Sequence, residues 1–375
     1  MLRDVCGLIY AGEENPNLRD LVMSRSVAAL PVGGRYRAID FLLSNMVNSG
    51  IRNVGIITHK NYKSLIDHLG SGKEWDLSRK NDGLFLLPPF DSSSNSHIYR
   101  GICDAINSKM DYLDHAPQQY CLLSGSYTVY SADYNRMMKA HLAHNADITM
   151  MYSTEALDFP GKERFKDVRL QTDGEGRVQD LEINTNNMRS AKLGMDVYLI
   201  NKSLLKYLVQ GSCAHGGYKF VSDLLIPNLK KLRIFAVPHD SYVCRLHSVY
   251  FYYRLNMDML DPLTRRDLFL PDRPVYTKIK DEPPVRYLQG AQVHNCILGD
   301  GCEIYGQAEN SVLFRGVALG RGARVKSSII GQGAAIGENC ELENVITDKY
   351  VRIRKGVRLI GTPEYPVIIR KSAVI

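Results

Sequence analysis

The sequence predicts an α/β domain with a mostly parallel sheet, followed by a left-handed parallel β-helix. Three observations predict this. Short apolar runs alternate with amphipathic, helix-length stretches as far as about residue 270, a proline-rich stretch follows, and a six-residue repeat begins near Val293. The chain also has 375 residues, more than one core usually fills. We therefore expect an α/β domain at residues 1–270, a linker at 271–292 and a β-helix at 293–375.

The first of these segments alternates strand and helix patterns. Strand-length apolar runs occur in VCGLIYAG, NVGIIT, QYCLLSG and DITMMYS, and helical patterns occur in FLLSNMVNSG, YKSLIDHLG and YNRMMKAHLAHN. Two of the helical stretches end at Gly50 and Gly70, the residue type that commonly follows a helix. This alternation is the signature of a parallel sheet with crossover helices.

The remainder of the chain changes its pattern twice. Pro271, Pro274, Pro283 and Pro284 suit an extended linker. Beyond it, aliphatic residues recur in steps of six, and four of them precede a glycine directly. A hexapeptide repeat predicts a triangular parallel β-helix in which each aliphatic side chain points inward and stacks on the coil below. These inward positions are Leu298, Ile304, Leu319, Val325, Ile330, Ile336, Leu342, Ile353 and Leu359.

Composition excludes several classes of protein. The net charge of +7 is small and dispersed, which does not indicate nucleic-acid binding but is compatible with phosphorylated metabolites. No apolar run approaches the roughly 20 residues of a membrane span, and the start MLRDVCGLIYAG indicates a first strand rather than a signal peptide. The eight cysteines are scattered without a CxxC pair, which fits a reducing compartment. We expect a cytoplasmic protein that binds neither nucleic acid nor membranes.

The segment GLIYAGEENPNL stands where the first strand passes into a helix. In a doubly wound sheet, this junction binds phosphate through backbone N–H groups, provided that glycines let the backbone approach. Here Glu13 and Glu14 add negative charge, and Pro16 removes a backbone donor. The loop is therefore expected to be a poor site for a nucleotide triphosphate.

Long strings along essentially the whole chain carry a resemblance. They are GGRYRAIDFLLSNMVNSGIRNVGIIT (33–58), GSGKEWDLSRKNDGLFLLPP (70–89), YRGICDAI (99–106), FVSDLLIPNL (220–229), ENSVLFRGVALGRGARVKSSIIGQG (309–333) and IGENCELENVITDKYVRI (336–353). With them the chain resembles the ADP-glucose pyrophosphorylase (glucose-1-phosphate adenylyltransferase) family, which supplies ADP-glucose for bacterial glycogen. The resemblance implies a Rossmann-like, nucleotidyltransferase-like first domain.

The chain departs from this family where the family binds the nucleotide. The family loop AGGxGTRL is replaced by AGEENPNL, which puts Glu13 and Asn15 at glycine positions and Asn17 at the position of the arginine that contacts the triphosphate. The family signature KRAKP is replaced by SRSVA, so that Val27 stands in place of the second lysine. The resemblance therefore implies that these contacts are lost.

Two further departures concern the metal and the sugar phosphate. The family motif LAGDH carries an aspartate that holds the catalytic Mg²⁺, and LSGSY puts Ser126 there. A neutral hydroxyl cannot replace a carboxylate on a hard dication that also bridges phosphates. The family motif EKP has a lysine on the sugar phosphate, and Ile183 stands at that position. Because losing one such group typically costs about 10²–10³ in rate, we expect no intact catalytic residue and no metal on this chain.

Other positions of the family pattern are kept. They imply either a remnant sugar-nucleotide pocket or a turn and helix cap that maintain the fold: Gly12, Tyr99, Arg100, Gly101, Asp104, Glu182 and Asp223. A second set implies a regulatory anion site, because several arginines can chelate a phosphate or sulfate, although a solvated surface is the plain alternative. This set is Arg25, Arg35, Arg37 and Arg315.

Together, the kept and lost positions resemble the GlgD-type, regulatory branch of the family. The resemblance implies little or no activity alone, a homologous catalytic subunit as partner in a heterotetramer, Mg²⁺ on that partner, and a phosphorylated effector. Three alternatives stay open. The chain could be an active pyrophosphorylase with altered loop chemistry, a stand-alone sugar-nucleotide sensor, or a β-helix acyltransferase, for which His294 is the only histidine in the repeat region.

Overall fold

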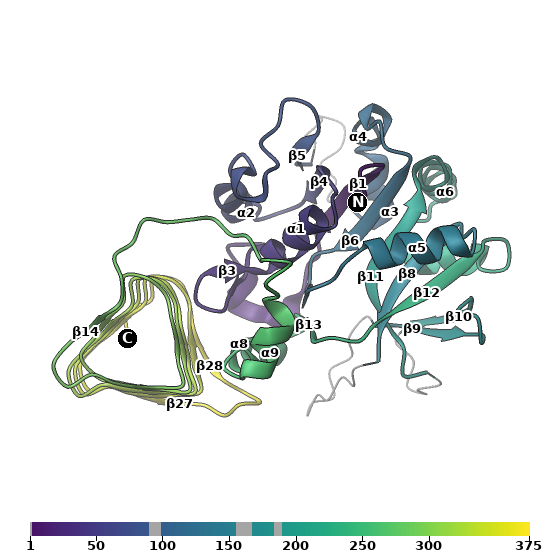
Figure 1. Cartoon of the computed structure of the whole chain (residues 1–375). Coiled ribbons are helices and arrows are strands. Elements are labelled where there is room, and N and C mark those ends of the chain that lie inside the picture. Colours follow the sequence, from purple (N-terminus) through teal and green to yellow (C-terminus); the bar gives the residue numbers. More distant parts are fainter. Residues whose placement is uncertain (1, 90–98, 155–166, 184–189) are drawn as a thin grey trace. The chain divides into compact units, whose positions relative to one another are not determined.

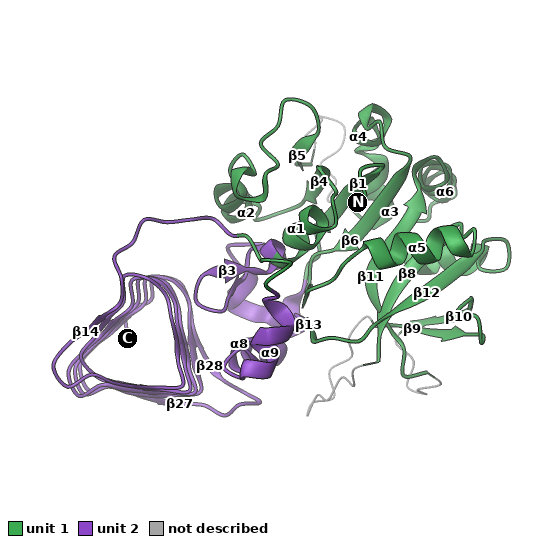
Figure 2. Cartoon of the chain, in the orientation of Figure 1, with its two compact units in different colours: residues 1–14, 41–243, 271–276 green, residues 15–40, 244–270, 277–375 purple. Residues whose placement is uncertain are grey.

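The computed structural model describes residues 2–89, 99–154, 167–183 and 190–375. The chain divides into two compact units (Figure 2). Unit 1 comprises residues 1–14, 41–243 and 271–276, and unit 2 comprises residues 15–40, 244–270 and 277–375. These units differ from the domains expected at 1–270 and 293–375, because residues 15–40 and 244–270 group with the β-helix. Buried polar contacts explain this grouping, such as the hydrogen bonds from the Tyr253 hydroxyl to Ser327 O and Asn344 Oδ1.

Unit 1 is built on a mixed, mostly parallel sheet (Figure 1). Strands β6, β1, β4 and β5 run parallel in that order, and β11 joins this group to β8, β9 and β10 through antiparallel pairs. Nine strands belong to the sheet in the described part of the chain. They are β1 (Val5–Ala11), β4 (Asn53–Thr58), β5 (Gly83–Leu87), β6 (Tyr120–Gly125), β8 (Ile148–Ser153), β9 (Val168–Thr172), β10 (Val178–Ile183), β11 (Leu193–Asn201) and β12 (Ile234–His239).

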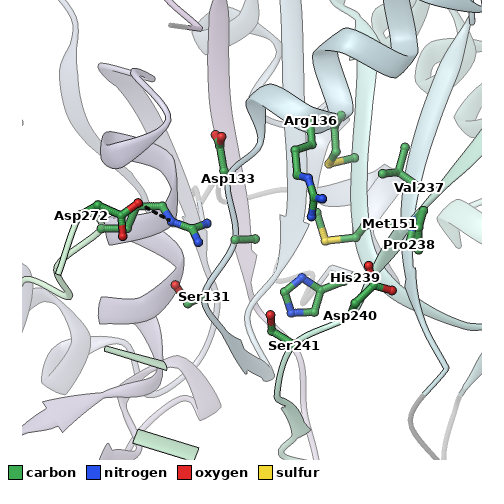
Figure 3. Close-up of a pocket in the computed structure, with 13 residues that line it drawn as sticks. Ser131, Asp133, Arg136, Met151, Val237, Pro238, His239, Asp240, Ser241 and Asp272 are labelled. Atoms are coloured by element: carbon green, nitrogen blue, oxygen red, sulfur yellow. Dashed lines mark ion pairs between the residues drawn. The ribbon is translucent and has the colours of Figure 1, made fainter. Parts of the chain in front are cut away.

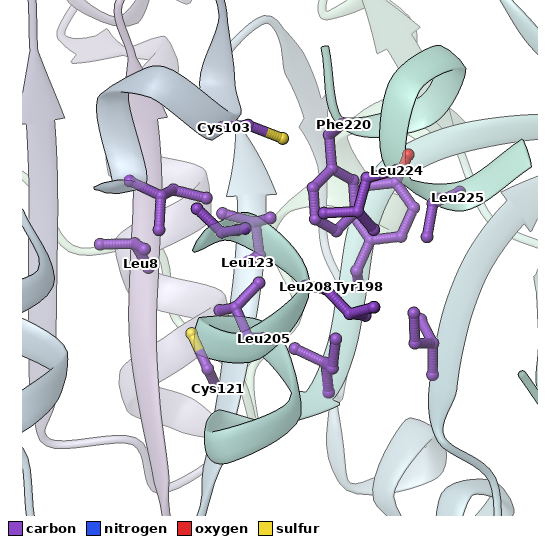
Figure 4. Packing of buried hydrophobic residues seen from close by; sticks show 14 of the residues in the cluster. Leu8, Cys103, Cys121, Leu123, Tyr198, Leu205, Leu208, Phe220, Leu224 and Leu225 are labelled. Atoms are coloured by element: carbon purple, nitrogen blue, oxygen red, sulfur yellow. The ribbon is translucent and has the colours of Figure 1, made fainter. Parts of the chain in front are cut away.

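Helices connect these strands, as the alternating pattern predicts. The larger ones are α1 (Ala38–Asn48), α2 (Lys63–Leu69), α3 (Ile102–Asn107), α4 (Met110–His115), α5 (Asn135–Ala143) and α6 (Lys202–Ala214). Short elements complete the chain between them: η3 (Lys73–Trp75), β7 (Thr128–Tyr130), η4 (Phe220–Leu225), α7 (Ile226–Asn228) and β13 (Val243–Arg245). Figure 4 shows the core between sheet and helices, where Leu8 and Leu123 of the strands lie with Leu205 of α6 and Phe220 of η4.

Unit 2 contains a small set of elements besides the β-helix. They are η1 (Pro16–Val22), η2 (Val27–Ala29), β2 (Pro31–Val32), β3 (Tyr36–Arg37), α8 (Val249–Asp258) and α9 (Pro262–Leu268). Pro16 and Pro262 stand in the first turn of their helices, where a missing N–H costs nothing. Asn15 and Asp261 cap these helices through their side chains.

The C-terminal part of unit 2 is the predicted parallel β-helix, seen end on as a triangle in Figure 1. Its three sheets have five strands each in the described residues. The first contains β14 (Arg286–Tyr287), β17 (Glu303–Ile304), β20 (Ala318–Leu319), β23 (Ala335–Ile336) and β26 (Arg352–Ile353). The second contains β15 (Gln292–His294), β18 (Gln307–Glu309), β21 (Arg324–Lys326), β24 (Glu341–Glu343) and β27 (Arg358–Ile360). The third contains β16 (Ile297–Leu298), β19 (Val312–Leu313), β22 (Ile329–Ile330), β25 (Val345–Thr347) and β28 (Val367–Ile369).

The inward positions expected from the repeat are confirmed. All nine belong to the core of the β-helix, with Leu298 and Leu359 partly buried near its two ends. Ile304, Leu319, Ile336 and Ile353 stack directly on one another, in steps of 15, 17 and 17 residues. The coils are shorter than three full hexapeptides, and the first strand already begins at Arg286, inside the stretch expected to be a linker.

The helices and the cysteines of the described residues bear on two further expectations from the sequence. None of its helices combines the length and the apolar character that crossing a bilayer requires. All eight cysteines are free thiols. Six of them are buried, so their packing in the core accounts for them without a disulfide.

Candidate functional site

Strands β1 and β6 end together in unit 1, at the place where a doubly wound sheet usually binds its ligand. They pair in parallel, with Tyr10 opposite Gly125. The ring of Tyr10 covers Gly12, since a Cβ added to Gly12 would lie 2.7 Å from Cε2 of that ring. Ser126 follows β6, and its hydroxyl is buried without a hydrogen-bond partner. An aromatic ring and a neutral hydroxyl therefore occupy the positions expected for phosphate and metal binding.

Two carboxylates converge on Gly125. The atoms nearest to a Cβ placed on this glycine include Oδ2 of Asp196 and, at 3.0 Å, Oε1 of Glu13. Burial raises the pKa of the Asp196 carboxyl to about 6, although a hydrogen bond with Tyr198 acts in the opposite direction. Acidic groups thus gather at the carboxyl end of β6, and Glu13 of the loop is one of them.

Asp196 is a site residue that the sequence analysis did not identify. It lies in β11 with a φ of 57°, in the left-handed region that few residues other than glycine adopt. The signal in the sequence is a single acid within the apolar run LGMDVYLIN. An isolated acid in a strand normally points to solvent, so this signal alone does not locate the carboxylate beside Gly125.

The side chain of Glu14, the second acid of the loop, is mostly exposed to solvent. Its carboxylate is 3.2 Å from Nζ of Lys60 and 3.8 Å from Nδ1 of His59, and its side chain is 64% exposed. Burial lowers the pKa of His59, which favours the neutral imidazole. Exposed pairs of this kind stabilise a protein by little. Glu14 therefore contributes charge to the loop rather than a fixed structure.

The kept YRG segment forms a local network at the start of α3. The guanidinium of Arg100 donates to both carboxylate oxygens of Asp104, at 3.2 and 3.1 Å. Gly101 lies against the backbone of Tyr218, whose carbonyl carbon would be 3.0 Å from an added Cβ. The hydroxyl of Tyr99 is buried without a hydrogen-bond partner. Arg100, Gly101 and Asp104 are thus engaged in maintaining the fold, and Tyr99 alone has an unsatisfied polar atom.

The other kept residues of this set also have structural contacts. Asp223 accepts hydrogen bonds from the backbone N–H groups of Tyr218 and Lys219, both at 2.9 Å. With the Ser222 hydroxyl, these bonds lower the pKa of Asp223. Glu182 and Ile183 lie at the end of β10, partly buried. The structure therefore separates Asp223 and Glu182 into different elements, and it places an aliphatic side chain where the family has a lysine.

In unit 2, the altered loop has become part of a fixed structure. The amide of Asn15 donates to the carbonyls of Leu246 and His247, at 2.9 and 2.8 Å, and its oxygen accepts from Asn17 N at 3.1 Å. Val27 is 2% exposed and lies in the core. Asn15 and Val27 thus replace ligand-binding residues of the family by residues with internal contacts.

The four arginines expected to form an anion site all lie in unit 2. Arg25 is 3% exposed, and its Nη2 donates to both carboxylate oxygens of Asp348 at 2.8 Å. Its Nη1 is buried without a hydrogen-bond partner. Arg315 is 7% exposed, and its Nε, 4.0 Å from Asp300, also has no hydrogen-bond partner. Two nearly buried guanidiniums therefore keep unused donors.

Two lysines join these arginines. Burial, Arg37 and Arg25 lower the pKa of Lys349 to about 7. Burial, Arg315 and Arg37 likewise lower the pKa of Lys280. These effects show that the positive charges lie close enough to repel one another, and that the neighbouring carboxylates do not neutralise them fully.

Arg35 belongs to the same set of positive charges. Burial and, after it, the guanidinium of Arg35 lower the pKa of Arg315. We call the six residues the basic cluster: Arg25, Arg35, Arg37, Lys280, Arg315 and Lys349. The sequence pattern indicates the four arginines of this cluster but neither of its lysines. Lys280 lies in a stretch expected to be a linker, and Lys349 follows the acid Asp348, so neither has a sequence signal of anion binding.

Comparisons with known proteins agree with this description. A family model for nucleotidyl transferases matches residues 6–226, and a model for the GlmU-like C-terminal hexapeptide matches residues 284–364. The glycogen biosynthesis protein GlgD of Bacillus subtilis (strain 168) is 36% identical over 98% of this chain and 96% of its own length. GlgD of Geobacillus stearothermophilus is 37% identical over 100% of this chain and 98% of its own length.

A catalytic relative is nearly as similar. The glucose-1-phosphate adenylyltransferase of Geobacillus stearothermophilus is 33% identical over 87% of this chain and 84% of its own length. The fold thus defines a nucleotidyl transferase domain followed by a hexapeptide β-helix. Within that class, the chain belongs to the glucose-1-phosphate adenylyltransferase family and to its GlgD type.

Proposed function

We propose that this chain is a non-catalytic or weakly active regulatory subunit of glucose-1-phosphate adenylyltransferase in glycogen biosynthesis. It would assemble with a homologous catalytic subunit, which makes ADP-glucose and pyrophosphate from ATP and glucose 1-phosphate, as a heterotetramer. A phosphorylated effector would bind the basic cluster. The observation that carries this proposal is the contrast between a ligand position filled by Tyr10, Glu13 and Asp196 and a cluster of cations with unused donors.

The residues at the end of β6 do not fit the Mg²⁺ that the family uses. Ser126 supplies a neutral hydroxyl where the resemblance implies a carboxylate in the family. In the described residues, no three His, Cys, Asp or Glu side chains gather as metal ligands. A hard dication prefers several carboxylate oxygens. We therefore assign the metal-dependent chemistry to the catalytic partner.

The first test is turnover by the purified chain with ATP, Mg²⁺ and glucose 1-phosphate. We expect a rate at least about 10³-fold below that of the catalytic homologue, because several charge-stabilising contacts are replaced. The variant Ser126→Asp should not restore the rate, since Glu13, Asp196 and Tyr10 stay in place. Turnover comparable with the homologue would instead support the active pyrophosphorylase with altered loop chemistry.

The second test is co-expression with the catalytic homologue. We expect a mixed oligomer with an altered affinity for ATP or an altered response to phosphate and sulfate. Arg37→Gln in this chain should keep the oligomer and weaken that response, whereas the control Lys355→Gln, an exposed lysine of the same β-helix, should change neither. Failure to form a mixed oligomer, or unchanged kinetics within one, would favour the stand-alone sensor.

A further inference from the structure

A cavity of about 310 Å³ lies in unit 1, and none of its lining residues belongs to the sites described above. Figure 3 shows it between the carboxyl ends of β8 and β12, the first turn of α5 and the segment at residues 271–276. In the parallel pair of β8 and β12, His239 lies opposite Ser153, where both strands end. The carboxyl end of parallel strands is the edge at which α/β proteins place their ligands.

His239 is the best-defined group in this cavity. It is 9% exposed, and its Nε2 has no hydrogen-bond partner. The imidazole is held in place by edge-on packing against Tyr130, with ring centroids 5.6 Å apart, and by a hydrogen bond with the backbone of Tyr242. A buried polar atom without a partner costs about 1–3 kcal/mol. A fixed ring with an unpaired nitrogen, on a residue that lines a cavity, therefore points to a bound polar group.

Two guanidiniums lie near this ring. Burial is the main cause that lowers the pKa of His239, and Arg136 and Arg273 act in the same direction. Figure 3 shows the Arg136 side chain extending from α5 toward His239 and Met151. Within the described residues, Arg136 makes no ion pair. Arg273 is 3.9 Å from Asp272, whose side chain is 78% exposed, so this pair is weak.

The cavity is also lined by three acids, Asp133, Asp240 and Asp272. Asp133 already accepts from the backbone N–H and the amide of Asn135, at 3.0 and 2.7 Å. Its carboxylate is directed away from His239 in Figure 3. Asp240 acts on His239 more strongly than either arginine does, but burial outweighs it, so the pKa of His239 stays lowered. The imidazole of His239 therefore stays neutral, and the cavity still contains the guanidiniums of Arg136 and Arg273.

We propose that this cavity binds a small phosphate-bearing metabolite. The guanidiniums of Arg136 and Arg273 would bind phosphate oxygens, which both can do with two N–H groups at once. His239 Nε2 would accept from a hydroxyl of the ligand, and Met151 would contact its carbon skeleton. The volume lies at the lower end of the range for small-molecule sites, which suits a ligand of the size of a sugar phosphate. This proposal is independent of the basic cluster, which belongs to unit 2.

The test uses the full-length chain carrying Arg35→Ala and Arg37→Ala, so that the basic cluster no longer dominates anion binding. Inorganic phosphate and glucose 6-phosphate are titrated by calorimetry. We expect saturable binding, weakened at least about tenfold by Arg136→Ala or Arg273→Ala, because a charge-assisted hydrogen bond contributes that much. Lys139→Ala, an exposed lysine on the same helix, is the matched control and should leave the affinity unchanged.

A local readout distinguishes this cavity from other anion sites. In chain labelled with ¹⁵N-histidine, the resonance missing from His239→Asn identifies the ring. We expect its Nε2 signal to shift on adding either probe, and not to shift when both arginines are replaced. Binding that survives both arginine replacements, a His239 signal that never moves, or no saturable binding at millimolar concentrations would each overturn the proposal. Because Arg136 is exposed, its replacement leaves the fold intact, which thermal unfolding checks.

Discussion

The carboxyl ends of β1 and β6 and the basic cluster of unit 2 are both places where this family is expected to bind phosphate, but they carry opposite charge. At the first, Glu13 and Asp196 converge on Gly125, and the ring of Tyr10 covers Gly12. At the second, Lys349 has a pKa of about 7 because of burial and the arginines around it. The first region has acidic groups and an aromatic ring at the expected ligand position, whereas the second has cations close enough to repel one another.

Under the proposed function, this difference is the one we expect of a chain that regulates a catalytic homologue and does not catalyse the reaction itself. At a position where the resemblance implies a substrate contact in the family, Asn15 instead donates to the carbonyls of Leu246 and His247. Repulsion within the basic cluster opposes folding, and an anion binding there would remove it. A costly arrangement of this kind is expected to persist where binding is still required.

The largest expected effect on stability concerns Asp348, whose carboxylate pairs with the buried Arg25 of the basic cluster. Asp348→Ala should lower the free energy of unfolding by about 3–5 kcal/mol, because it leaves the buried guanidinium of Arg25 without its counter-charge. Urea unfolding measures this change. Added sulfate should recover part of the loss in the variant, since an anion can take the place of the carboxylate.

The matched control is the exposed pair of Lys355 and Glu338 on the same β-helix, also 2.8 Å apart. Glu338→Ala should leave the free energy of unfolding nearly unchanged, because solvent screens this pair. Equal losses in the free energy of unfolding for the two variants would show that the buried guanidinium of Arg25 does not depend on Asp348 to balance its charge.

A smaller effect on the free energy of unfolding is expected for Asp196, which lies near the carboxyl end of β6. The pKa of Asp196 is raised from 3.8 to about 6, so the folded chain holds this proton more tightly than the unfolded chain. Stability is therefore lost as the pH rises from about 4 to about 6, by up to about 3 kcal/mol. Asp196→Asn removes this charge and tolerates the left-handed φ.

The measurement for Asp196→Asn is the free energy of unfolding against pH, compared with the parent chain. The variant should gain stability at about pH 7 and little at about pH 4. A gain that does not depend on pH would assign the effect to backbone strain at Asp196 rather than to its buried charge.

Much of the fold follows from the sequence because it depends on local periodicity. The stacked positions Ile304, Leu319 and Ile336 are evident from the hexapeptide pattern, and NVGIIT is evident as a strand from its apolar run. The boundaries of the two compact units do not follow in this way. They depend on pairs far apart in the chain, such as Arg25 with Asp348, which no local pattern records.

The site residues divide in the same manner. Glu13 and Ser126 stand out in the sequence because the family motif gives each of them a position to depart from. Asp196 and Lys349 were not found, because their importance comes from burial and from neighbours in space. A carboxylate in a strand and a lysine after an aspartate are ordinary in sequence, and only the fold gives them their perturbed pKa values.

The smallest expected effect is the pH dependence of anion binding at the basic cluster. Lys349 has its pKa lowered first by burial, then by Arg37, Arg25 and Lys280, while Asp348 acts in the opposite direction. An anion bound at the cluster would raise this pKa again, so that binding takes up a proton when the free lysine is neutral. Sulfate affinity should therefore be about tenfold weaker at about pH 8.5 than at about pH 6.

Sulfate is the suitable probe because its own charge does not change over this range. Calorimetry in two buffers measures the affinity and also counts the proton taken up on binding. Lys349→Met should bind sulfate more weakly and with little pH dependence, whereas Lys355→Met should behave as the parent chain does. A parent chain whose sulfate affinity is the same at both pH values would mean that Lys349 does not face the bound anion, and the anion site would then be confined to the arginines.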